Sequence, residues 1–139
     1  MLSEQLLQQL KNITDLQVAL AEEKRCLTEK DFSSFSNILF DKQKLLQNIA
    51  TLDAQLSIEK TLQVIQQSAE LTALKDSVET NLQACQKSNN VNGKLVELSM
   101  KSNKHLMQIL KQAKGKNSIT YDQKGTLNTG RLLGKDIQA

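Results

Sequence analysis

The sequence contains no proline and no tryptophan, and only 3% of its residues are aromatic. Proline removes a backbone donor and clashes inside helices, so its absence allows helices to run long and argues against many tight turns. No apolar run approaches the roughly 18 residues of a membrane span, so we expect no direct membrane insertion. The formal charge of +3 is small and the charges are interspersed, which is a poor electrostatic match for nucleic acid.

Cysteine is also scarce, because Cys26 and Cys85 are the only two. The start of the chain, MLSEQLLQQL, lacks the basic first residues and the continuous apolar stretch of a signal peptide. A cysteine pair could form a disulfide in a secreted protein, but a cytoplasmic location with two reduced thiols fits these features better.

No pattern that carries catalysis is present. His105 is the only histidine, no cluster has metal-ligand spacing, and there is no phosphate-binding loop, dinucleotide turn or nucleophile elbow. A helical bundle with an exposed histidine could relay phosphoryl groups, but the Lys-Gly pair expected close after that histidine comes only at Lys114 and Gly115. We therefore predict a protein that is not an enzyme and that needs no metal or cofactor.

Leucine at helical spacing supplies most of the apolar content. Leu6, Ile13, Leu20 and Leu27 are seven residues apart, which predicts an amphipathic helix over about 2–28. The segment TEKDFSSF interrupts the pattern, with Thr28 and Asp31 as possible caps. A second helix is predicted over 32–66, with a break near Ser57 left open. A third is predicted over 69–113, after the cap residue Ser68.

These helices predict an all-α fold, an elongated antiparallel three-helix bundle like a coiled coil, as one domain over 1–113. Two features of it have alternative interpretations. The aromatic cluster could be a partner hot spot or a plug at the end of the helical hairpin, and its members are Phe32, Phe35 and Phe40. The polar stretch of the third helix could be buried, fixing register, or face water, and it comprises Asn89, Asn92, Ser99 and Asn103.

The last segment, 114–139, differs in composition, because it holds four of the five glycines. Glycine at that density disfavours a stable helix. The segment nevertheless carries several apolar side chains, which fits a flexible tail that orders on a partner. An ordinary frayed terminus is the alternative.

Taken together, these segments resemble the FlgN-type flagellar export chaperones. The resemblance begins with Glu22 or Glu23, Leu27 and the Asp31-Phe32 turn, and continues with Lys44 and Leu45-Leu46. It then includes the asparagine-rich stretch NNVNGKLVEL, and ends with TYDQKG, which is similar to a Tyr-x-x-x-Gly signature. The resemblance implies a chaperone for the hook-filament junction proteins FlgK and FlgL, which binds their C-terminal helices, prevents premature assembly and delivers them to the export-gate component FlhA.

Such a chaperone would cover an amphipathic helix with apolar anchors. We place this groove on the third helix at Val96, Leu106 and Leu110, together with the tail, whose further partner-binding candidates are Ile119, Leu127, Leu132, Leu133 and Ile137. By resemblance, Tyr121 would dock on the export gate, with Gly125 setting the turn after it. We expect a monomer or weak homodimer. The alternative function is a structural coiled-coil adaptor of another secretion or cytoskeletal assembly, which would self-associate tightly.

Overall fold

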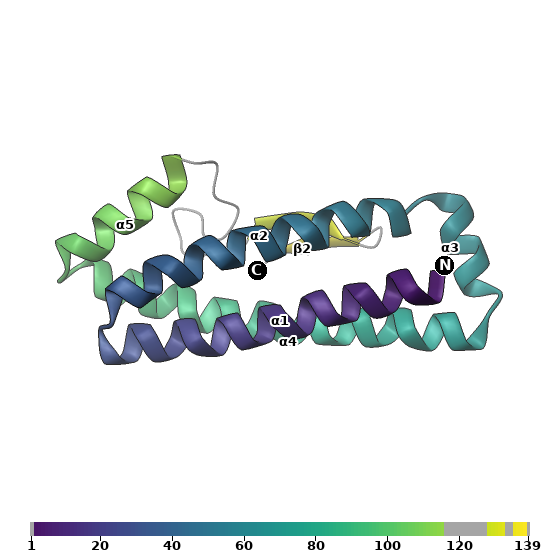
Figure 1. The fold of residues 1–139 in the computed structure, drawn as a ribbon, viewed down its shortest axis with the longest axis horizontal. Coiled ribbons are helices and arrows are strands. Elements are labelled where there is room, and N and C mark those ends of the chain that lie inside the picture. Colours follow the sequence, from purple (N-terminus) through teal and green to yellow (C-terminus); the bar gives the residue numbers. More distant parts are fainter. Residues whose placement is uncertain (1, 116–127, 133–134, 139) are drawn as a thin grey trace.

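The computed structural model describes residues 2–115, 128–132 and 135–138. Five helices are followed by two short strands (Figure 1). Their bounds are α1 Leu2–Glu29, α2 Phe32–Leu56, α3 Glu59–Gln66, α4 Ala69–Met100, α5 Lys104–Gly115, β1 Asn128–Leu132 and β2 Lys135–Gln138. No helix in this described part is long and apolar enough to cross a membrane.

The three long helices α1, α2 and α4 form an elongated bundle, which confirms the predicted fold class (Figure 1). The chain runs up, down and up, so α1 and α4 are parallel. Cys85 Sγ lies 3.7 Å from Ile13 O, and Asn92 Nδ2 donates to Leu20 O at 2.9 Å. Each of these contacts joins residues that are 72 positions apart in the sequence, as expected for two helices that run in the same direction. Within these helices α1 approaches both neighbours closely, whereas the backbones of α2 and α4 lie further apart.

The turn between α1 and α2 has a sequence-encoded geometry. Lys30 adopts a left-handed conformation with φ of 60°, and the Asp31 N–H donates to Cys26 O at 2.8 Å. That bond closes a helix C-terminus in the Schellman pattern. The Asp31 side chain then accepts from Ser34 N at 3.3 Å and caps α2. Of the two candidate caps, Asp31 is therefore confirmed, whereas Thr28 lies inside α1.

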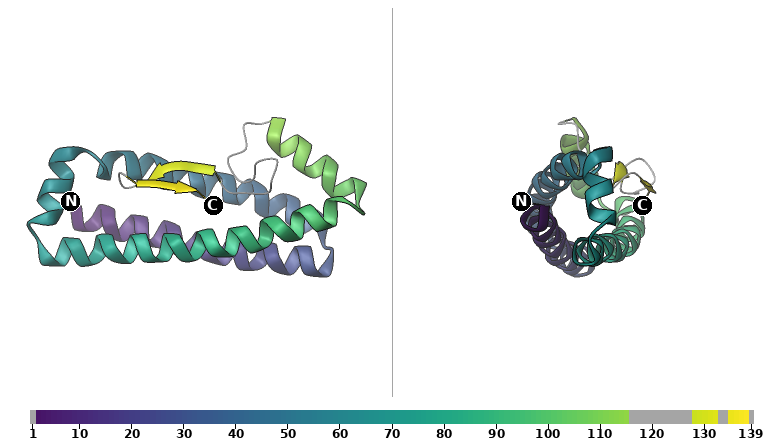
Figure 2. Two further views of the ribbon diagram at one scale, coloured as in Figure 1. Left: turned by 180° about the vertical axis from the view of Figure 1, so that it is seen from behind. Right: turned by 90° about the vertical axis from the view of Figure 1, so that its right-hand side faces the viewer.

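The predicted second helix, 32–66, is divided in two. It ends at Leu56, passes through Ser57 and the extended residue Ile58, and restarts as α3. A straight continuation would carry Ile65 roughly 13 Å beyond Leu56, past the end of the bundle. With the break, α3 crosses the end from α2 to α4 (Figure 2), and Ile65 is buried in the same cluster as Leu56.

The predicted third helix, 69–113, is also divided. Ser68 caps its start by accepting from Leu71 N at 3.2 Å, as expected. The helix ends at Met100, however, and α5 begins at Lys104 after a turn. Asn103 stabilises this new start, since its Oδ1 accepts from Leu106 N at 3.1 Å. The turn lets α5 fold back so that it packs on both α2 and α4.

The C-terminal segment that the sequence separated at residue 114 begins inside α5, which runs to Gly115. Its described residues beyond α5 form an antiparallel pair, with Asn128 opposite Gln138 and Leu132 opposite Lys135. Strand β1 lies beside α2 (Figure 2). Whether this segment is flexible stays a prediction.

Candidate functional site

The interior of the bundle is divided into two apolar clusters. The α3-end cluster comprises Leu6, Ile13, Leu16, Leu20, Leu46, Ile49, Leu56, Ile65, Val78, Leu82 and Cys85. The α5-end cluster comprises Cys26, Leu27, Phe32, Phe35, Leu39, Val96, Leu106 and Ile109. Each of the three long helices contributes to both clusters, so the division lies across the bundle rather than along it.

A buried polar layer separates the two clusters. It consists of Glu23 from α1, Lys42 from α2, and Asn89 and Asn92 from α4, and all four side chains are at most 1% exposed. Lys42 Nζ donates to the two Glu23 carboxylate oxygens at 3.3 and 3.2 Å and also to Asn89 Oδ1. Asn92 Nδ2 donates to Glu23 Oε1 at 2.9 Å. We call these four residues the Lys42 layer.

Electrostatics explain why the Lys42 layer needs all its members. Burial lowers the pKa of Lys42 below its usual value, and the facing Glu23 carboxylate partly opposes that change. A charge in such a place costs much free energy unless it is paired and hydrogen-bonded. The layer is not fully satisfied, because Asn89 Nδ2 and Asn92 Oδ1 have no hydrogen-bond partner among the described residues. It therefore joins three helices at a considerable cost in desolvation.

One half of this layer was predicted from the helical spacing of the sequence, and the other half was not. The structure confirms that Asn89 and Asn92 are buried and bonded rather than facing water. Glu23 and Lys42 were missed, although each continues a seven-residue track. Those tracks are Leu2, Gln9, Leu16 and Glu23 in α1, and Phe35, Lys42, Ile49 and Leu56 in α2. A search for polar residues on heptad positions would have found both.

The α5 end of the bundle holds the groove residues that the sequence predicted. Val96 and Leu106 are buried in the α5-end cluster, and Leu110 packs against it. The structure thus brings these three residues together, but it turns them inward onto Phe35 and Leu39 of the same cluster. In this conformation they do not line an open groove.

The aromatic residues divide between two environments. Phe32 and Phe35 are buried in the α5-end cluster, which confirms the predicted plug for these two. Phe40 is 52% exposed on α2, and Lys44 Nζ lies 4.5 Å from its ring centroid. Phe40 is therefore not part of the plug, because its helical position points away from the cluster.

The predicted tail residues are only partly covered by the structure. Leu132 is the last residue of β1, and Ile137 lies in β2. Ile119, Tyr121, Gly125, Leu127 and Leu133 lie outside the described residues. A role of any of these residues in partner binding stays a prediction.

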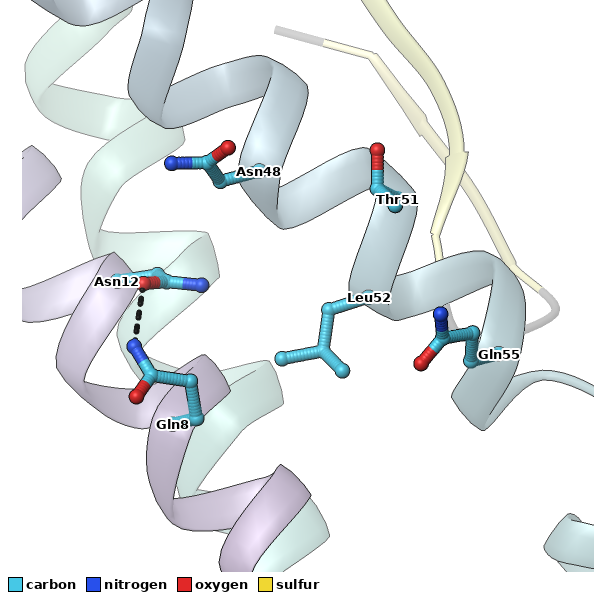
Figure 3. A pocket seen from close by; sticks show the side chains of 6 residues that line it. All are labelled: Gln8, Asn12, Asn48, Thr51, Leu52 and Gln55. Atoms are coloured by element: carbon cyan, nitrogen blue, oxygen red, sulfur yellow. Dashed lines mark hydrogen bonds between the residues drawn. The ribbon is translucent and has the colours of Figure 1, made fainter.

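A cleft of about 300 Å³ lies between α1 and α2, and one of its lining residues, Leu52, packs against the α3-end cluster (Figure 3). It is lined by Gln8, Asn12, Asn48, Thr51, Leu52 and Gln55. Gln8 Nε2 donates to Asn12 Oδ1 at 2.9 Å, and the neighbouring Gln9 donates to Ile49 O at 2.9 Å. Because its lining has amides and one hydroxyl but no charged side chain, the cleft can hydrogen-bond a polar group but offers no acid or base.

Reactive side chains are not gathered at any described position. Cys26 and Cys85 are both free and buried, and they lie in different clusters. Burial raises the pKa of the Cys85 thiol to about 12, which keeps it neutral. His105 is exposed on α5. Among the residues that the structure describes, no group of three His, Cys, Asp or Glu side chains could hold a metal ion.

The fold and its interior define a class of protein: an elongated helical bundle whose polar and apolar layers organise helix packing. The comparison with known families then identifies it. The family described as FlgN protein matches residues 1–129, so the chain belongs to the FlgN family and is a flagellar export chaperone. No curated protein and no solved structure matches the chain.

Proposed function

We propose that this chaperone binds the C-terminal amphipathic helices of FlgK and FlgL in the cytoplasm, prevents their premature assembly and delivers them to FlhA at the export gate. Membership of the FlgN family carries this proposal, because it makes the chain a flagellar export chaperone. The proposed chaperone is not an enzyme. It works by burying the apolar face of its cargo.

The helical bundle supports recognition of this kind. Its helices already pack against one another through leucine and isoleucine side chains at helical spacing. A cargo helix with the same pattern can make the same kind of contact. Burying four or five aliphatic side chains contributes roughly 1.5–3 kcal/mol each before entropic costs. After those costs the expected dissociation constant is on the order of micromolar, which allows release at the gate.

The test is a titration of the purified protein with peptides that span the C-terminal helices of FlgK and FlgL, followed by fluorescence anisotropy. Saturable binding at micromolar concentration is expected for at least one peptide. A matched peptide with Ser in place of its apolar-face residues is the control and should not bind. Equal binding of a native peptide and its Ser-substituted control would contradict the proposal. So would a lack of binding by both native peptides.

A structural adaptor is the competing function, and the oligomeric state separates the two. Light scattering should give a monomer or a weak dimer for a chaperone, since the long helices already bury their apolar seams against each other. A tight oligomer that binds neither peptide would instead indicate an adaptor.

A further inference from the structure

We propose that α5 is a displaceable helix: it covers a docking face formed by Phe35, Leu39 and Val96, and the amphipathic helix of an export substrate binds there in its place. This inference rests on the proposed function and adds to it the position of the binding face and the event that opens it.

The first support is the way in which α5 is seated. This 12-residue helix buries Leu106 completely and Ile109 almost completely in the α5-end cluster. Lys111 on its opposite side is exposed, and so is His105 at its flank. The face beneath α5 therefore already receives an amphipathic helix with aliphatic residues three positions apart. A guest with the same pattern can make the same contacts.

The second support is the weak attachment of α5. It joins α4 through the turn Lys101–Asn103 instead of continuing it. The side-chain cap at its start comes from Asn103, within its own turn, and would move with the helix. The side chains of α5 are described up to Gln112, and apolar packing holds these in place. The ion pairs and the interhelical hydrogen bonds of the described residues involve residues outside α5.

The third support is the Lys42 layer, which limits how far an opening would spread. The α5-end cluster lies wholly on one side of it, and the α3-end cluster on the other. Release of Leu106 and Ile109 would expose one cluster and leave the long Leu6–Leu20 seam packed. Local opening of this kind needs less free energy than global unfolding.

Displacement and direct contact predict opposite effects for one substitution in the full-length protein. Leu106→Asp places a charge in a fully buried position and should release α5. If α5 competes with the guest, its release raises the fraction of binding-competent protein, and the FlgK and FlgL peptides should bind about tenfold more tightly. His105→Asp introduces the same charge on the exposed side of α5 and should leave the affinity unchanged.

Weaker or unchanged binding by Leu106→Asp would overturn the inference, since weaker binding would mean that Leu106 contacts the guest directly. Failure of the unsubstituted protein to bind any peptide would instead overturn the proposed function. The two failures are therefore distinguishable.

A second measurement decides the matter even if Leu106→Asp fails to fold. Spin labels are attached to Asn37→Cys on α2 and Gln108→Cys on α5, both at exposed positions, in a protein whose free thiols Cys26 and Cys85 are replaced by Ala. Saturating peptide should lengthen the distance between the labels in this folded protein. An unchanged distance with bound peptide would show that α5 stays in place, which would overturn the inference.

Discussion

Glu23 and Lys42 form an ion pair of 3.2 Å in the interior of the bundle, where neither side chain has any exposed surface. The pair joins α1 to α2, and the donation from Lys42 to Asn89 extends it to α4. Lysine is long enough to connect α2 with α4, whose backbones lie apart. The same group thus holds the bundle together and divides its apolar interior.

Removing one member of this pair should cost far more than removing both. Lys42→Met leaves the Glu23 carboxylate buried without its cation, and we expect a loss of about 3–5 kcal/mol in the free energy of unfolding. The double variant Glu23→Met with Lys42→Met removes both charges and should recover most of that loss. Urea denaturation of the wild type, both single variants and the double variant gives the coupling. Additive losses would contradict a coupled pair.

Stability should fall in alkaline solution because of Cys85. Its folded pKa of about 12 lies above the ordinary unfolded value of ~8.5. A neutral Cys85 therefore contributes fully to the free energy of unfolding below pH ~8.5. Above that pH its contribution declines by up to ~1.4 kcal/mol per pH unit, until about pH 12.

Cys85→Ala should flatten this decline, as measured by urea denaturation at several pH values. Lys42 acts with the opposite sign, because its lowered pKa makes its burial less costly as the pH rises toward the ordinary lysine value of ~10.4. Since both proteins contain Lys42, the difference between their pH profiles reports on Cys85 together with its charge coupling to Lys42. Parallel profiles would contradict the assignment.

The two thiols should report separately on the two clusters. Cys26 lies in the α5-end cluster and Cys85 in the α3-end cluster, and neither is exposed. If α5 opens locally, Cys26 should react with a maleimide at least tenfold faster than Cys85. This ratio is taken after correction for the different thiolate fractions of the two cysteines. Peptide mapping by mass spectrometry gives both rates in one sample. Labelling in fully denaturing urea supplies the reference rates.

The left-handed residue after α1 offers a stabilising substitution. Lys30 has φ of 60°, a conformation that costs a residue with a side chain roughly 1 kcal/mol relative to glycine. Lys30→Gly should therefore raise the free energy of unfolding by up to that amount. Thr28→Gly, inside α1, is the matched control and should lower it by roughly 0.3 kcal/mol, because threonine is itself a weak helix former. Thermal denaturation of both variants decides the sign.

Tyr121 provides a test of gate docking. Tyr121→Ala should retain peptide binding and lose binding to the cytoplasmic part of FlhA, whereas Tyr121→Phe should lose less because the ring remains. Pull-down with purified FlhA and anisotropy with the cargo peptides measure the two activities separately. Retained FlhA binding by Tyr121→Ala would remove the assignment.

Local signals in the sequence predicted the beginnings of the helices well. Asp31 and Ser68 both cap helices as expected, because a short polar side chain bonds to a backbone N–H a few residues ahead regardless of tertiary contacts. The breaks at Ser57 and Lys101 were not predictable in the same way. Neither lies at a proline or glycine, so they follow from where α3 and α5 must turn to bury Ile65 and Leu106.

The candidate site shows the same limit. The helical spacing correctly grouped Val96, Leu106 and Leu110, yet it could not show that α5 folds back and turns these side chains inward. Glu23 and Lys42 escaped attention because ionised residues on a seam lower its apparent hydrophobicity. Each continues a seven-residue track, but their burial depends on each other, and the pairing of residues on two helices cannot be read from either helix alone.

The bundle is closed in different ways at its two ends. Helix α3 is joined to long helices on both sides, through Ser57 and Ile58 and then through Gln67 and Ser68, so it can hardly swing aside. Helix α5 is joined to a long helix on one side only, through the short turn 101–103 after α4. The rod therefore has two structurally different ends, so a partner that recognises one of them binds the rod in a single direction.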